Sequence, residues 1–158
     1  MIVVKVKEIV LDQSMSPVVI LVNEEETKAL PIWIGPFEAH AIALGLQGVL
    51  ASRPMTHDLM KSLCEQFHAS ISRIVVADVR EGTYYAEIHL EQEGREIVID
   101  SRPSDAIALA LRSGTSLYIT EKVEAYSLAM EDLIPEDQQD ELKQLLEGNE
   151  DDPNKSLH

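Results

Sequence analysis

The stretch DSRPSDAIALALR, residues 100–112, joins a predicted strand to a predicted helix through an arginine–proline pair. Arg102 stands directly before Pro103, and Asp105 lies in the first turn of the helix that follows. A guanidinium is a natural bidentate partner of phosphate or carboxylate, and the free N–H groups at a helix N-terminus also attract anions. The stretch therefore predicts an anion-binding position at the start of a helix.

A second arginine–proline pair occurs earlier in the chain, in SRPMTHD at residues 52–58. Arg53 precedes the proline here, and Asp58 falls in the first turn of the next predicted helix. Two such sites brought together would form an anion-binding cleft. A purely structural interpretation stays open, in which Thr56 and Ser104 are N-caps, the acids complement the helix dipoles and the arginines pair with the acids.

Apolar patterns around these two motifs predict an alternation of strands and helices. Runs rich in Val and Ile indicate strands, and apolar residues at helical spacing indicate helices. The predicted strands cover residues 2–11, 18–22, 29–34, 71–79, 83–90, 97–99 and 116–120, and the predicted helices cover 35–50, 57–67, 105–112, 122–130 and 135–146. This order predicts an α+β fold, a mainly antiparallel sheet with packed helices. Because each half contains an Arg-Pro helix start, it also suggests an internal duplication.

Charge is unevenly distributed along the chain of 158 residues, whose formal net charge is −15. Residues 131–158 hold ten acids and two bases, so more than half of the excess lies in this last part. We expect one folded domain at residues 1–130, followed at 131–158 by an acidic helix and a disordered tail. The acidic body favours only weak or transient binding of a polyanion, through a local arginine cluster.

The composition and the start of the chain indicate in which cellular compartment we expect the protein. No run approaches the roughly 18 apolar residues of a membrane span, and the start MIVVKVKEIV lacks the layout of a signal peptide. The lone cysteine excludes any internal disulfide. We therefore expect a cytoplasmic protein without a membrane partner.

Four stretches occur in an order and spacing that fit one family. They are LPIWIGPFEAHAIAL at residues 30–44, RPMTHDL at 53–59, EGTYYAEI at 81–88 and DSRPSDAIALALR at 100–112. Together they resemble the bifunctional nuclease family, a group of small domains reported to act on both RNA and DNA. The resemblance covers roughly residues 1–130 and implies a hydrolase with RNase and DNase activity.

Phosphodiester hydrolysis needs a positioned water, charge stabilisation on the phosphoryl oxygens and a route for protons. In the first motif, Arg53 could clamp a non-bridging oxygen and His57 could transfer protons near neutral pH. Asp58 could orient His57 or bind a metal. Thr56 is a candidate substrate-binding residue beside them.

In the second motif, Arg102 would be the matching clamp and Asp105 the matching acid, with Ser104 as a cap or a phosphate ligand. No histidine follows it, so we expect a single catalytic centre that draws on both motifs. Glu38, in the first turn of an earlier predicted helix, is the third candidate carboxylate. Glu38, Asp58 and Asp105 could bind Mg²⁺ or Mn²⁺ if the fold brings them together, but no spacing in the sequence demands a metal.

The leading hypothesis is a cytoplasmic nuclease with broad specificity for RNA and DNA, acting at a cleft between the two Arg-Pro motifs. Two alternatives belong to other classes. A non-catalytic anion-binding or regulatory module would use the same arginines to hold a ligand, and the net charge of −15 favours it. A structural homo-oligomer would use the motifs as ion-paired interfaces. The exposed strand edges of a meander favour such self-association.

Overall fold

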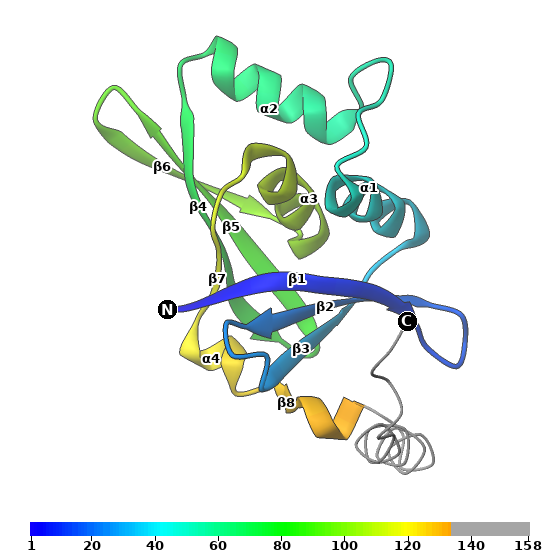
Figure 1. The fold of residues 1–158 in the computed structure, drawn as a ribbon. Coiled ribbons are helices and arrows are strands. Elements are labelled where there is room, and N and C mark those ends of the chain that lie inside the picture. The colour runs from blue at the N-terminus through cyan, green and yellow to red at the C-terminus, as the bar shows by residue number, and fades with distance from the viewer. Residues whose placement is uncertain (134–158) are drawn as a thin grey trace, which may run out of the picture.

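The computed structural model describes residues 1–133, which form eight strands and four helices (Figure 1). The strands are β1 (Ile2–Leu11), β2 (Pro17–Asn23), β3 (Lys28–Trp33), β4 (Ser70–Arg80), β5 (Thr83–Gln92), β6 (Arg95–Ser101), β7 (Leu117–Ile119) and β8 (Leu128–Ala129). The helices are α1 (Pro36–Gln47), α2 (Thr56–Gln66), α3 (Pro103–Ser113) and α4 (Glu121–Glu124), and a 3-10 turn follows at Met130–Leu133. None of these helices is both long and apolar enough to cross a membrane. The helix predicted at 135–146 and the tail predicted after it lie outside the described residues.

All eight strands belong to one sheet, in the order β6-β5-β4-β7-β1-β2-β3-β8. Every neighbouring pair is antiparallel except β4 and β7, which run parallel. The predicted α+β fold with a mainly antiparallel sheet is therefore confirmed. Two meanders, β1–β2–β3 and β4–β5–β6, lie on either side of β7, and the internal duplication stays a prediction.

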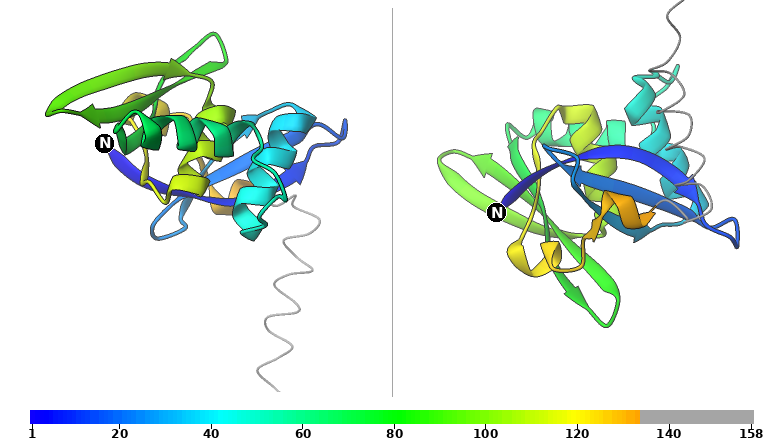
Figure 2. Two further views of the ribbon diagram at one scale, coloured as in Figure 1. Left: turned by 90° about the horizontal axis from the view of Figure 1, so that it is seen from above. Right: turned by 60° about the horizontal axis from the view of Figure 1, so that its bottom comes forward.

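Helix α3 lies at the centre of the molecule, packed between the sheet and the helices α1 and α2 (Figure 1 and Figure 2). The sequence AIALA at residues 106–110 is entirely buried, and its three alanines leave room for neighbouring elements to approach closely. Gly45 of α1 has the same effect, since a Cβ there would lie 3.0 Å from the Cβ of Leu111. The tight packing of α3 fixes its N-terminus, and therefore the positions of Arg102 and Asp105.

The helix predicted at residues 122–130 is wrong in its second half. Helix α4 ends at Glu124, and the chain then forms β8, which pairs with β3. The outer face of β2 and β3 carries a second buried apolar cluster, formed by Val18, Ile20, Val22 and Ala29. Met130 and Leu133 pack against this cluster, and removal of that apolar surface from water favours this path over a continued helix.

Helix α1 ends at Gln47 rather than at residue 50. Gly48 adopts the left-handed conformation with a φ of 64°, and its N–H donates to the carbonyl of Gly45. A glycine reaches this conformation without the steric cost of a Cβ. The cap begins the loop at residues 48–55, which carries Arg53 and leads into α2.

Strand β6 forms one edge of the sheet and is exposed along nearly its whole length, including Ile97, Val98 and Ile99. Unpaired backbone groups and apolar side chains at such an edge favour pairing with another strand. The homo-oligomer stays a prediction, and this edge is the surface that supports it.

Candidate active site

Three helices begin with an acid at the same position. Glu38, Asp58 and Asp105 are each the third residue of their helix, α1, α2 and α3 respectively. A carboxylate in the first turn complements the partial positive charge at the helix N-terminus. The three acids therefore share a helix-stabilising role, and their different partners decide what else each one can do.

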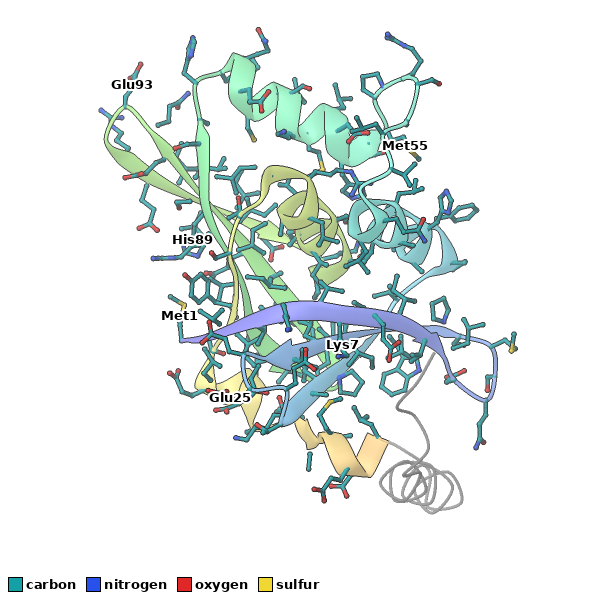
Figure 3. The ribbon with its side chains drawn as sticks, in the orientation of Figure 1. Met1, Lys7, Glu25, Met55, His89 and Glu93 are labelled. Carbon is teal, nitrogen blue, oxygen red and sulfur yellow. The ribbon has the colours of Figure 1, made fainter. Side chains whose placement is uncertain are left out.

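The N-caps of α2 and α3 are Met55 and Arg102 rather than Thr56 and Ser104. In α3 the proline takes the first helical position, to which its fixed φ is suited, and this places the cap at Arg102. In α2 a carboxylate oxygen of Asp58 accepts the N–H of Met55 at 2.9 Å. Met55 lies just before α2 (Figure 3), so the helix starts one residue earlier than predicted. Thr56 and Ser104 are consequently free of a capping role.

The two arginine–proline motifs meet at Asp105. Nε2 of His57, from the first motif, lies 3.0 Å from one carboxylate oxygen of Asp105. Arg102, from the second motif, donates from Nε to the other oxygen at 2.8 Å and from Nη1 to Glu38 at 3.1 Å. One histidine, one arginine and two carboxylates are thus joined in a single network at the starts of α1, α2 and α3.

Asp105 fixes the orientation of His57, which is only 7% exposed. Burial alone would raise the pKa of Asp105, but hydrogen bonds from Arg102 and His57 outweigh burial and hold this pKa below its usual value. An ionised carboxylate only accepts hydrogen bonds, so His57 donates from Nε2. In the tautomer with its proton on Nε2, the lone pair is on Nδ1, and within residues 1–133 Nδ1 has no hydrogen-bond partner. Nδ1 is therefore the nitrogen that can accept a proton.

We expect Asp105→Asn to weaken the fold at neutral pH and to make its stability less sensitive to acid. A carboxyl group whose pKa is lowered on folding stabilises the folded state above its unfolded pKa of about 3.9. That contribution is lost as the pH falls through the lower, folded pKa. Urea unfolding at neutral pH and at about pH 3 measures the effect. The variant should lose less stability over this range than the wild type, and equal losses would contradict the network.

Glu38 reaches Arg102 because Gly35 leaves room for it. A Cβ at position 35 would lie 2.1 Å from Oε2 of Glu38. The backbone of Gly35 is ordinary extended chain, with a φ of −78°, so its small size rather than its flexibility is what the site requires. The glycine of the GPFEA sequence therefore lets the carboxylate of Glu38 fold back over the start of α1.

Asp58 belongs to a separate, structural contact. Arg112, in the last turn of α3, donates from Nε to Asp58 at 3.2 Å and from its other nitrogens to the carbonyls of Ala108 and Ala41. Arg112 thereby connects α1, α2 and α3. The carboxylate that contacts His57 is that of Asp105 rather than that of Asp58. Arg112 is absent from the predicted site residues. Its signal in the sequence is a lone cation at the end of an apolar helix, where cations bind free carbonyls.

Arg53 stands apart from the network around Asp105. It lies in the exposed loop before α2 and makes no hydrogen bond or ion pair with any other residue in 1–133. It also lines neither of the pockets that contain Arg102. The clamp at Arg53 stays a prediction, since no contact in the described residues directs this side chain toward His57.

The three candidate carboxylates do not make a set of metal ligands. Glu38 and Asp105 share the guanidinium of Arg102, whereas Asp58 faces Arg112. A cation already held between two carboxylates opposes a divalent ion at the same place. Within residues 1–133, no group of three or more His, Cys, Asp or Glu side chains is placed to hold a metal.

Two neighbouring pockets open on the network and share Glu38 and Arg102 as a common wall. We call the first, of about 280 Å³, the histidine pocket; besides the shared pair its lining includes His57, Asp105, Thr56 and Arg112. We call the second, of about 330 Å³, the tryptophan pocket; its lining includes Trp33, Tyr84 and Ser104. The candidate substrate-binding residues Thr56 and Ser104 therefore lie in different pockets.

His89, a second buried histidine, lies away from both pockets on β5 (Figure 3). Its Nδ1 lies 2.8 Å from Glu96, and its Nε2 lies 2.9 Å from Glu87. Arg73 of β4 also contacts Glu96, at 3.1 Å. These contacts join β4, β5 and β6, which gives His89 a structural role.

Residues 19–130 match the family model of the bifunctional nuclease domain. The matched range contains all four members of the network around Asp105. The chain belongs to the bifunctional nuclease domain family. The resemblance expected from the four sequence stretches is thus confirmed, and membership of this family supports a nuclease-related function.

The chain is similar to proteins of a bacterium and of rice. An uncharacterized protein of Mycobacterium tuberculosis is 42% identical over 125 residues, which cover 79% of this chain and 72% of the relative. Proteins named bifunctional nuclease 1 in Oryza sativa and bifunctional nuclease in Oryza minuta are each 22% identical over 121 residues. These matches cover 75% of this chain and 36% of each rice protein.

Proposed function

We propose that this protein is a nuclease that hydrolyses phosphodiester bonds of both RNA and DNA with broad specificity. The observation that carries the proposal is the 3.0 Å pairing of His57 with Asp105 in a pocket that also presents Arg102. Phosphodiester hydrolysis uses a base, a group that orients the base and a cation that binds phosphate. The rice relatives are named as bifunctional nucleases, which supports the proposed activity.

In the proposed reaction, a water molecule attacks the phosphorus atom, and its proton passes to Nδ1 of His57. Asp105 holds the ring through Nε2 and stabilises the imidazolium that forms. The bond between phosphorus and the leaving oxygen breaks, and protonated His57 returns the proton to that oxygen. The products are a phosphomonoester and a free hydroxyl group.

Arg102 stabilises the charge on the phosphoryl oxygens. A guanidinium has five N–H donors, and Asp105 and Glu38 take one each, which leaves three for a phosphate. The side chain is 65% exposed, so a substrate can reach it. The two acids position the arginine but also compete with phosphate for it. This competition, in an acidic chain, supports weak or transient binding of nucleic acid.

Broad specificity follows from the group on which the site acts. The phosphodiester is common to RNA and DNA, and contacts to phosphate carry no sequence information. The proposed roles of His57, Asp105 and Arg102 all concern the phosphate, the attacking water and the leaving oxygen. The same three residues can therefore serve both substrates.

Gly35→Ala should impair hydrolysis by displacing Glu38 from Arg102, while the fold is kept. Alanine tolerates the backbone conformation at this position, and the atom that must move is the end of a flexible side chain. We expect kcat/KM to fall about as much as it does in Glu38→Gln. The double variant should lose no more than either single variant, because both changes remove the same contact. Additive losses would contradict this role of Gly35.

Hydrolysis of RNA and DNA by chromatographically pure protein tests the proposed function. His57→Ala protein, purified in parallel, controls for a contaminating nuclease. We expect both activities to elute with the wild-type protein through the last column. The fractions that contain the variant should be about 10²- to 10⁴-fold less active. Equal activity in the two preparations would contradict the proposal.

A further inference from the structure

The walls of the tryptophan pocket come from segments that lie far apart in the sequence. Trp33 lies at the end of β3, Tyr84 at the start of β5 and Ser104 at the start of α3. In the sheet, β3 and β5 are separated by β4, β7, β1 and β2. The sheet is curled (Figure 2), and residues of both strands line one pocket. Three of the four stretches that resemble the family therefore meet here.

Trp33 is anchored although it is 60% exposed. Its Nε1 donates to a carboxylate oxygen of Asp12 at 2.9 Å. That hydrogen bond, helped by the backbone N–H of Ser16, holds the pKa of Asp12 below its usual value and so keeps the acceptor charged. An anchored and exposed indole in the wall of a pocket offers a π-face for stacking at little cost in side-chain entropy.

Tyr84 adds a second aromatic ring to the same pocket. Its ring packs against the apolar core that α3 and the sheet form between them, and burial raises the pKa of its hydroxyl. Tyr84 follows the tight turn at Glu81 and Gly82, whose φ angles are 50° and 77°. This turn, part of the EGTYY sequence, brings the start of β5 to the pocket.

Polar residues also line the tryptophan pocket. Ser104 is only 6% exposed and lines the pocket, yet its hydroxyl makes no hydrogen bond within residues 1–133. Arg102 lines both pockets and keeps N–H donors that neither Glu38 nor Asp105 occupies. An aromatic surface beside a phosphate-binding cation is the combination that a nucleotide requires.

We propose that the tryptophan pocket binds one unpaired nucleobase, stacked on Trp33, beside the phosphodiester held at Arg102, so that single-stranded nucleic acid is the substrate class. The inference rests on the proposed function, since the bond to be cleaved lies in the adjoining histidine pocket. A base within a duplex is covered by its neighbours and its partner, and only an unpaired base can enter. Stacking accepts every base, which agrees with broad specificity.

The size of the pocket limits what it can hold. Its volume of about 330 Å³ lies near the lower end of the roughly 300–1,000 Å³ range of small-molecule sites. This space suits a single base with its sugar. The strand would continue past Arg102 into the histidine pocket, with its next phosphate beside His57.

Tryptophan fluorescence tests the proposal directly, because Trp33 is the only tryptophan in the chain. The probes are a phosphorothioate oligothymidylate of about eight nucleotides, an abasic oligomer of the same length and charge, and the matching duplex. We expect saturable quenching by the oligothymidylate. The abasic oligomer should bind roughly 5- to 150-fold more weakly, the range for loss of one stacked base. Equal binding of the two, or equal quenching by the duplex, would overturn the base pocket.

Variants of the aromatic residues test whether the base binds in the tryptophan pocket. Tyr84→Leu should weaken binding of the oligothymidylate at least about fivefold, whereas Tyr84→Phe should keep it. Phe67→Leu is the matched control, because Phe67 is an exposed aromatic residue that does not line the pocket. If Tyr84→Leu fails to fold, Trp33→Leu replaces it, with binding followed by anisotropy of a labelled oligothymidylate. Trp33 is exposed, so its loss leaves the core intact.

The outcomes for the pocket and for the nuclease are separable. Protein that binds the oligothymidylate in this way but hydrolyses neither RNA nor DNA would overturn the proposed function and leave the base pocket standing. Protein that hydrolyses both, while its binding ignores the base, Trp33 and Tyr84, would overturn the base pocket alone.

Discussion

Replacement of His57 by alanine is expected to lower the turnover of phosphodiester hydrolysis about 10²- to 10⁴-fold, the range typical for loss of a general acid–base group. The reason is that Nδ1 of His57 is the free nitrogen of a ring that Asp105 holds in the histidine pocket. Asp105 keeps its ion pair with Arg102 in the variant, so folding should change little. The measurements are kcat on RNA and on DNA, together with thermal unfolding.

His68→Asn is the matched control for this variant. His68 is exposed just beyond the end of α2 and lines neither pocket. Its φ of 57° is left-handed, and asparagine tolerates that conformation better than alanine does. Turnover should be unchanged in this control. A well-folded His57→Ala protein with the same turnover as the wild type would remove His57 from the mechanism.

Arg102→Ala should lower kcat/KM about 10²- to 10³-fold, the size of effect seen when a donor to a developing negative charge is removed. Arg102→Lys should still cost about 10-fold, although the charge is kept. Lysine cannot present a planar fork that holds Glu38, Asp105 and a phosphate together, and one charge-assisted hydrogen bond is worth roughly that factor. The measurement is kcat/KM for both variants on one RNA and one DNA substrate.

Arg53→Lys is the control for Arg102→Lys, and the two losses of kcat/KM are compared. Both arginines precede a proline before a helix, but Arg53 has no partner within residues 1–133. We therefore expect a smaller loss at Arg53 than at Arg102. Losses of equal size would assign a substrate contact to Arg53 as well. Full activity of Arg102→Lys would show that charge alone suffices, and the clamp would be wrong.

Most of the fold could be predicted from the sequence because its signals are local. Strands β1 to β6 follow runs of β-branched residues separated by polar or glycine-containing turns, and α3 follows an apolar run that a proline opens. The segment after Glu124 could not be predicted in this way. Its path depends on the apolar cluster of β2 and β3, which only the assembled sheet presents.

The candidate site was less accessible to sequence reasoning, because its contacts join distant residues. Asp58 stands next to His57 in the chain and was the natural candidate to orient it, yet its carboxylate caps α2 and pairs with Arg112. Asp105, in the other motif, takes that position. Spacing along the chain carries no information on such a pairing, which is set by how α2 packs across α3.

Chemical rescue of His57→Ala by imidazole tests most directly whether the His57 ring carries the proton in phosphodiester hydrolysis. Alanine leaves space where the ring stood beside Asp105, and free imidazole can fill it as the base. We predict that added imidazole restores hydrolysis of RNA and DNA in a saturable manner, with no comparable rise for the wild type or for Arg102→Ala. Residual activity of His57→Ala that imidazole leaves unchanged, in protein shown to be folded and to bind the oligothymidylate, would contradict the account.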